Sequence, residues 1–110
     1  MSDEPTAKHY VFLMKLSEPM RDRMGQLPRV MDEIAAAWEE LTGSPLTVLA
    51  TLGVNDLVAF GDAADDQMAA FFAFQLASNG AVQSTTSQGY TSTEVGSVLG
   101  QIPIPTMRVK

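Results

Sequence analysis

Residues 9–16 of this chain form an apolar run, His-Tyr-Val-Phe-Leu-Met-Lys-Leu. Its length and its flanking prolines are typical of a single β-strand. Side chains alternate between the two faces of a strand. One set is wholly apolar, Tyr10, Phe12, Met14 and Leu16, and the other is His9, Val11, Leu13 and Lys15. Because Val11 and Leu13 form the centre of the second set, we expect both faces of this strand to be covered.

The rest of the sequence predicts three further strands and two main helices. The expected strands cover residues 9–16, 46–52, 57–60 and 81–90, and the helices cover 28–41 and 67–78. Gly43 and Gly80 follow the helices as C-cap residues, and Asp65 precedes the second helix as its N-cap. The order strand, helix, strand, strand, helix, strand is a split βαβ repeat. We therefore expect an α+β fold: a ferredoxin-like βαββαβ sandwich with a four-stranded antiparallel sheet, two helices on one face, and the first and third strands in the middle.

Shorter segments flank this domain. Residues 1–8 are expected to be a disordered N-terminal segment, residues 9–92 the domain, and residues 93–110 a short helix with an extended tail. Ser92 is expected to cap that helix, which reaches about Leu99, and Pro103 and Pro105 favour an extended end. Residues 20–25 fit only an irregular helical turn.

A partner chain is the simplest cover for the second face of the sheet. The third strand also lacks a polar side, because Val58 and Phe60 alternate with two other apolar residues. Most soluble oligomers are symmetric homo-oligomers. We expect a homo-oligomer, most simply a dimer, held by the face of Val11 and Leu13. The alternative cover is the chain's own C-terminal helix, through its apolar residues Val95, Val98 and Leu99.

The two helices supply the other half of the expected core. Helical periodicity assigns Trp38 and the phenylalanines to the core. The apolar residues of helix 67–78 occupy more than one stripe, which leaves little room for a solvated side. These residues are Met68, Phe71, Phe72, Phe74 and Leu76.

Composition and charge exclude several function classes. The chain has no cysteine and one histidine, which excludes disulfide scaffolds, thiolate chemistry and a His-rich metal site. A formal net charge of -6 argues against nucleic-acid binding. The acidic start and the lack of a long apolar stretch predict a cytoplasmic protein without a membrane span. Phosphate-loop and dinucleotide fingerprints are missing, so we expect no cofactor and no metal. The acidic residues Asp62, Asp65 and Asp66 lack the further ligands of a calcium loop and suit a helix N-terminus.

Residues 51–58, Thr-Leu-Gly-Val-Asn-Asp-Leu-Val, resemble the centre of the GYD domain family, in which Thr-Leu-Gly, a spacer and Tyr precede Asp-Leu-Val. The first strand, Asp65-Asp66, the Ala- and Phe-rich helix and Gly80 follow in the family's order, so the resemblance covers about residues 10–94. It implies a ferredoxin-like, dimeric α+β barrel-type fold and carries no well-established activity. Asn55 stands where the family's tyrosine is usual, and residues 18–28 match poorly.

Four residues are candidates for chemistry. His9 is either a general base or an ordinary surface or interface histidine. Lys15 either binds an anion or reaches solvent from the strand end. Asp56 either fixes the turn before the third strand by bonding turn amides or lies at a pocket rim. Tyr90 follows the polar residues 84–88, which form either an edge strand or the wall of a polar cavity between sheet and helices.

Three function classes remain open. The first is a small oligomeric binding or accessory protein of the GYD type, with a small-molecule ligand and no catalysis. The second is a cofactor-independent enzyme, monooxygenase- or isomerase-like, acting on a small organic molecule between sheet and helices through His9, Lys15, Asp56 or Tyr90. The third is a structural assembly subunit. A pocket around His9 or Lys15 with a shifted pKa favours the enzyme, whereas a filled core without a cavity favours assembly alone.

Overall fold

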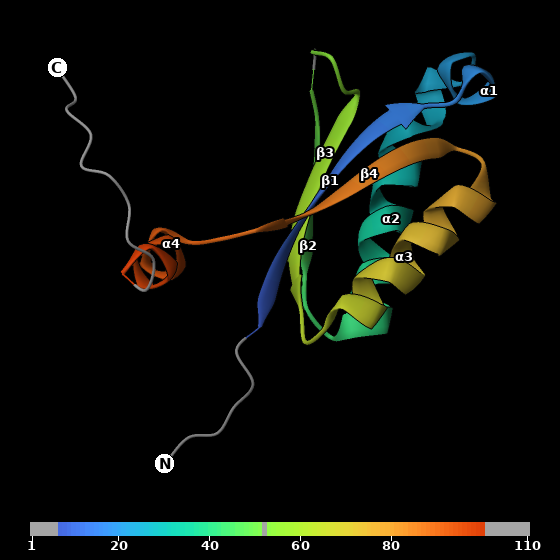
Figure 1. The fold of residues 1–110 in the computed structure, drawn as a ribbon. Coiled ribbons are helices and arrows are strands. Elements are labelled where there is room, and N and C mark those ends of the chain that lie inside the picture. Colours follow the sequence, from blue (N-terminus) through green and yellow to red (C-terminus); the bar gives the residue numbers. More distant parts are fainter. Residues whose placement is uncertain (1–6, 52, 101–110) are drawn as a thin grey trace, which may run out of the picture.

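The computed structural model describes residues 7–51 and 53–100. Its elements are β1 (Lys8–Leu16), α1 (Glu18–Arg21), a 3-10 turn (Met24–Gln26), α2 (Leu27–Thr42), β2 (Leu46–Ala50), β3 (Leu57–Ala63), α3 (Asp66–Asn79), β4 (Val82–Gly89) and α4 (Ser92–Leu99). The strands form one antiparallel sheet in the order β2-β3-β1-β4. Figure 1 shows α2 and α3 against one face of the sheet, while α4 projects on the opposite side at the end of β4. The predicted fold class and the central positions of the first and third strands are confirmed.

Local capping chemistry sets most helix boundaries where the sequence placed them. The side chain of Asp65 accepts a hydrogen bond from the Met68 amide at 3.1 Å and begins α3. Gly43 and Gly80 end α2 and α3 with φ values of 76° and 79°. This left-handed conformation is strained for residues with a Cβ, which accounts for glycine at both positions.

Several predicted boundaries were wrong. Thr91, not Ser92, caps α4. The side chain of Thr91 accepts from the Glu94 amide, and the Glu94 carboxylate accepts from the Thr91 amide, which completes a capping box. β3 continues to Ala63 rather than ending at residue 60, because β1 starts at Lys8 and pairs with these extra residues. Pro103, Pro105 and residues 1–6 lie outside the described residues.

The core lies between the helix layer and the sheet and is built around aromatic rings. Phe12 and Phe72 meet Trp38 edge-to-face, with ring centroids 5.4 and 5.0 Å apart. Such edge-to-face pairs add to the stabilisation from burial. A Cβ at Gly61 would lie 2.9 Å from both Trp38 Nε1 and Leu46 Cδ1. Glycine on β3 therefore makes room for the tryptophan.

The assignment of every phenylalanine to the core was wrong. Phe12 and Phe72 are fully buried, but Phe60, Phe71 and Phe74 are 44%, 52% and 71% exposed. Only one stripe of α3 faces the sheet, and Phe71 and Phe74 lie outside it. Phe60 is on β3, on the side of the sheet that α2 and α3 do not cover. The buried residues of that stripe are Ala69, Phe72 and Leu76.

The face of the sheet away from α2 and α3, called here the open face, has an apolar centre on three strands. In register, Val11 lies beside Phe60, Leu13 beside Val58, and Val58 beside Leu49. Leu49 is 50% exposed. The chain's own α4 does not cover these residues, because it projects away from them and leaves its own apolar side chains exposed. The chain's own C-terminal helix, which the sequence offered as the alternative cover of the open face, therefore does not cover it in this chain.

The polar strand β4 is an edge strand, as one of the two interpretations predicted. Thr85, Thr86, Ser87 and Gln88 are exposed. Thr86 lies beside Phe12 on the helix-covered side, but the space between sheet and helices there is filled by apolar side chains. Within residues 7–51 and 53–100, the core between the sheet and the helices is therefore apolar, which does not support the alternative of a polar cavity there. Among the helices of the described part of the chain, none is long and apolar enough to cross a membrane.

Candidate functional site

His9 and Asp62 form a hydrogen-bonded pair at one end of the open face. They are directly opposite in the β1–β3 register, so both side chains point to the same side of the sheet. His9 Nδ1 lies 2.6 Å from Asp62 Oδ1. A carboxylate that accepts from Nδ1–H fixes the ring orientation and leaves Nε2 as the working nitrogen. The orienting partner that a histidine base needs is therefore present.

A second carboxylate approaches the other side of the His9 ring. Glu94 Oε1, at the start of α4, lies 3.6 Å from His9 Nε2. The hydrogen bond to Asp62 raises the pKa of His9 above its ordinary 6.5, burial opposes this, and the charges of Asp62 and Glu94 add to it. His9 thus links β1, β3 and α4, and it holds its proton to higher pH than a free histidine.

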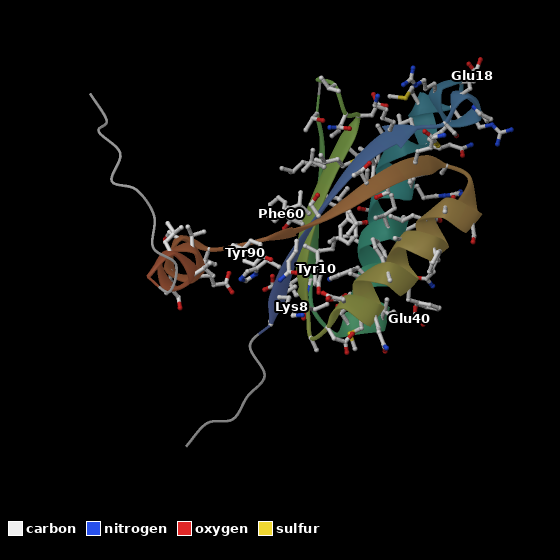
Figure 2. All side chains as sticks on the ribbon, in the orientation of Figure 1. Lys8, Tyr10, Glu18, Glu40, Phe60 and Tyr90 are labelled. Carbon is white, nitrogen blue, oxygen red and sulfur yellow. The ribbon has the colours of Figure 1, made fainter. Side chains whose placement is uncertain are left out.

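A pocket of about 320 Å³ lies beside this pair and opens on the open face. Its lining combines a few polar groups with apolar and aromatic ones: His9, Val11, Phe60, Asp62, Tyr90 and Thr91. Figure 2 shows Phe60 and Tyr90 where the end of β4 leaves the sheet. Small-molecule sites have volumes of about 300–1,000 Å³ and this kind of mixed lining. The structure therefore brings together two of the four predicted candidates, His9 and Tyr90.

The helix-covered side of the same sheet end is braced by a second polar cluster. The Tyr10 hydroxyl donates a hydrogen bond to Asp66, and Lys8 Nζ lies 3.6 Å from the other oxygen of that carboxylate. Burial and this hydrogen bond raise the pKa of Tyr10, and the same hydrogen bond lowers the pKa of Asp66. The cluster ties β1 to the start of α3 and so supports the strand that carries His9.

Lys15 and Asp56 lie at the opposite end of the sheet from His9. Asp56 Oδ2 accepts from the Leu16 amide at 2.9 Å and from Arg21 Nη2 at 3.3 Å. The predicted bonds to amides of the turn itself were wrong, because the carboxylate reaches across to the end of β1. Its role is still conformational. Lys15 is exposed on the open face and does not line the pocket beside His9.

Asp62 and Glu94 are the site residues that sequence reasoning missed. Asp62 was assigned to the loop before α3, because the third strand was ended at residue 60. A strand three residues longer would have placed it beside His9 in the antiparallel register. Glu94 had a usable signal, since Thr-x-x-Glu is a capping box, but its contact with His9 depends on where α4 leaves the sheet.

A larger hollow of about 520 Å³ lies between α2 and α3. Its lining includes Phe71, Phe74 and Ile34, and Glu33 is its one charged residue. It therefore has no histidine or paired titratable groups that point to chemistry. Within residues 7–51 and 53–100, no group of three His, Cys, Asp or Glu side chains is arranged to hold a metal ion.

A model of the GYD domain matches residues 10–99, which include β1 from Tyr10 onward, the other three strands and all of α4, but not His9. The chain belongs to the GYD domain family. No curated protein and no solved structure matches it. The resemblance read from residues 51–58 and from the first strand is confirmed, and the family match continues past Glu94 to the end of α4.

The departure from the usual GYD sequence lies far from the His9 pocket. Asn55 is in the bend between β2 and β3, where its carbonyl accepts from Thr51 Oγ1 at 2.5 Å. β3 runs from this bend toward Asp62, so the bend and the His9 pocket lie at opposite ends of the strand. The replacement of the family's tyrosine by asparagine therefore leaves the His9 pocket of this GYD protein intact.

We expect Asp56→Ala to destabilise the fold by about 1–2 kcal/mol, because it leaves the Leu16 amide without its acceptor. Asp56→Asn keeps an acceptor oxygen and should therefore lower the free energy of unfolding by less than Asp56→Ala does. Urea unfolding at one protein concentration measures both changes. Asp22→Ala, a nearby exposed aspartate, is the control and should leave the midpoint unchanged. Equal midpoints for Asp56→Ala and the control would contradict the conformational role of Asp56.

We expect Asp62→Asn to bring the pKa of His9 back toward 6.5, because it removes the negative charge of Asp62 and leaves only a neutral acceptor for the His9 ring. A raised folded-state pKa stabilises the protein below the unfolded value, and this contribution is lost as pH rises through the folded pKa. The stability advantage of the native chain over Asp62→Asn should therefore shrink as pH rises above 6.5, the ordinary pKa of histidine. His9 is the single histidine, so its ring protons give one NMR titration curve. An unchanged curve would show that Asp62 does not control the ring.

Proposed function

We propose that this GYD protein is a homo-oligomeric small-molecule-binding protein whose ligand occupies the His9 pocket. The observation that carries the proposal is the pocket itself, where the hydrogen-bonded pair of His9 and Asp62 faces Phe60 and Tyr90. Apolar and aromatic walls bury a ligand, and a few oriented polar groups choose it. A small organic molecule with one hydrogen-bonding group fits this combination.

The apolar centre of the open face supports the oligomer. Exposed Leu49 and Phe60 and half-buried Leu13 form one patch across β2, β3 and β1. A contiguous exposed apolar patch on a soluble protein marks an interaction surface. Pairing of two open faces about a two-fold axis buries the patch on both chains and covers the pocket mouth.

The test is an NMR titration of the isotope-labelled protein with phenol, benzoate, indole and hexanoate as probes. We expect at least one aromatic probe to shift the signals of His9, Phe60 and Tyr90 together. Tyr90→Ala should weaken the binding of that probe several-fold, because it removes an aromatic wall of the pocket. Gln83→Ala, at the far end of the same face, should not.

Two results would overturn the binding proposal. One is that none of the four probes shifts the His9 signals at millimolar concentration. The other is that the shifts map to the hollow between α2 and α3, around Phe71 and Phe74. Either result with an intact oligomer would favour an assembly subunit, the third function class.

A cofactor-independent enzyme is the second candidate, and the Asp62–His9 hydrogen bond is the observation that favours it. A histidine oriented by a carboxylate moves protons to and from a substrate held at its second nitrogen. His9 Nε2 has Glu94 nearby at 3.6 Å, beyond ordinary hydrogen-bond distance, which leaves it free to meet a ligand. The enzyme would use His9 for proton transfer at carbon or oxygen of a bound small molecule.

Hydrogen–deuterium exchange at a carbon acid separates the enzyme from the binding protein. Hydroxyacetone in D₂O is the probe, and NMR follows loss of its C–H signals. The enzyme predicts faster exchange with the native protein than with His9→Gln at equal concentration. Equal exchange rates would contradict the enzyme hypothesis. They would be consistent with a binding protein, which does not need to catalyse exchange.

A further inference from the structure

The helix α4 carries an apolar stripe that is not buried in its own chain. Val95, Val98 and Leu99 lie on one side of the helix by their i, i+3, i+4 spacing. They are 43%, 49% and 46% exposed, and no residue of α4 is buried. An eight-residue helix is marginal in water without packing partners. A stable α4 therefore needs a surface on which this stripe can pack.

The start of α4 is fixed in direction by the sheet. Only Tyr90 and Thr91 separate it from β4, and the Thr91–Glu94 capping box sets its first turn. Glu94 also lies beside His9 on β1. These contacts direct the helix away from its own sheet on the open-face side, as Figure 1 shows. The stripe and the chain's own open face are both uncovered, but they are held apart.

We infer that α4 is an arm that packs on a second copy of this chain, with Val95, Val98 and Leu99 against the apolar residues of that copy's open face. The inference rests on the proposed pairing of open faces. Two-fold symmetry makes each arm reach the other chain, so both uncovered surfaces of each chain are buried at once. Glu94 is the only charged residue of α4, and it is held by its own cap and by His9, so packing of the stripe buries no charge.

The arm also connects assembly to the His9 pocket. Tyr90 and Thr91 line the pocket, and Glu94 adjoins the His9 ring. Packing of α4 on the second copy therefore fixes one wall of the pocket. In this arrangement the ligand site is complete only in the oligomer.

The arm is tested by placing a charge in its stripe. We expect Val98→Asp and Leu99→Asp each to weaken the dimer by about tenfold or more in sedimentation equilibrium, because each puts a carboxylate into an apolar contact. Ser97→Asp adds the same charge to an exposed polar position of α4 and should leave the dimer unchanged. Because α4 contributes nothing to the core, all three variants should keep the native thermal midpoint when compared as monomers.

The outcomes separate the arm from the proposed assembly. If the native chain is a dimer, and Val98→Asp and Leu99→Asp dimerise as tightly as Ser97→Asp, then α4 does not pack on the second copy. Face-to-face pairing would remain in place. A native chain that is monomeric at tens of micromolar would overturn both. Selective weakening by the two stripe variants supports the arm.

Discussion

The variant Leu13→Glu is expected to convert the proposed homo-oligomer into monomers of 11.8 kDa. Leu13 lies on the open face of the central strand β1, beside Val58 on β3. Burying a leucine is worth roughly 1.5–3 kcal/mol, and two-fold pairing uses the residue once in each chain. A carboxylate at this position would be buried against the same apolar patch of the other chain without a partner charge. Light scattering or sedimentation measures the mass directly.

The matched control is Phe74→Glu on the helix side. Phe74 is 71% exposed on α3, so the same charge is introduced at an exposed apolar residue of the other layer. This variant should remain a dimer. If Phe74→Glu dissociates the assembly and Leu13→Glu does not, the hollow between α2 and α3 is the interface. A native mass of 11.8 kDa at tens of micromolar would contradict any pairing.

The fold could be predicted because each element carries its own local signal. Single residues mark where the strands and helices begin and end. They are the prolines on either side of β1, the N-cap Asp65 and the glycines after α2 and α3. Element order then leaves few topologies, because crossovers are right-handed and short. These are properties of neighbouring residues, so a single sequence suffices to read them.

The errors arise where the outcome depends on residues far apart in the chain. Whether β3 ends at Phe60 or at Ala63 depends on how early β1 begins, since the added residues need pairing partners. That difference alone decides whether Asp62 is a loop residue or the partner of His9. From the sequence alone, His9 and Tyr90 are only separate candidates for chemistry. Their proximity comes from the β1–β4 pairing of His9 with Gly89.

The open face has two uses in the proposed assembly. Its centre is apolar and suits pairing, whereas its His9 end is polar and suits a ligand. A pocket at the edge of an interface is covered when the interface forms, which strengthens its hydrogen bonds by excluding water. Binding of a ligand and assembly are then coupled, and a ligand that contacts both chains favours the dimer.

The substitution Phe72→Ala is expected to cost about 3–5 kcal/mol of unfolding free energy, the range for removing a buried phenylalanine. Phe72 is fully buried, and its ring meets Phe12 and Trp38 edge-to-face at 5.1 and 5.0 Å between centroids. Its removal leaves a cavity at the centre of the core and breaks both contacts. The total free energy of unfolding of a small domain is about 5–15 kcal/mol, so this loss is a large part of the stability.

Phe74→Ala is the matched control, because it removes the same side chain from the same helix two residues away. Because Phe74 is 71% exposed, its removal should change the free energy of unfolding by no more than about 0.5 kcal/mol. Trp38 is the single tryptophan and lies in the core, so its fluorescence reports urea unfolding of both variants. At one protein concentration the two urea midpoints should separate widely with similar slopes. Equal losses for both variants would mean that the outer side of α3 is buried in solution, and the helix layer would then be an interface as well.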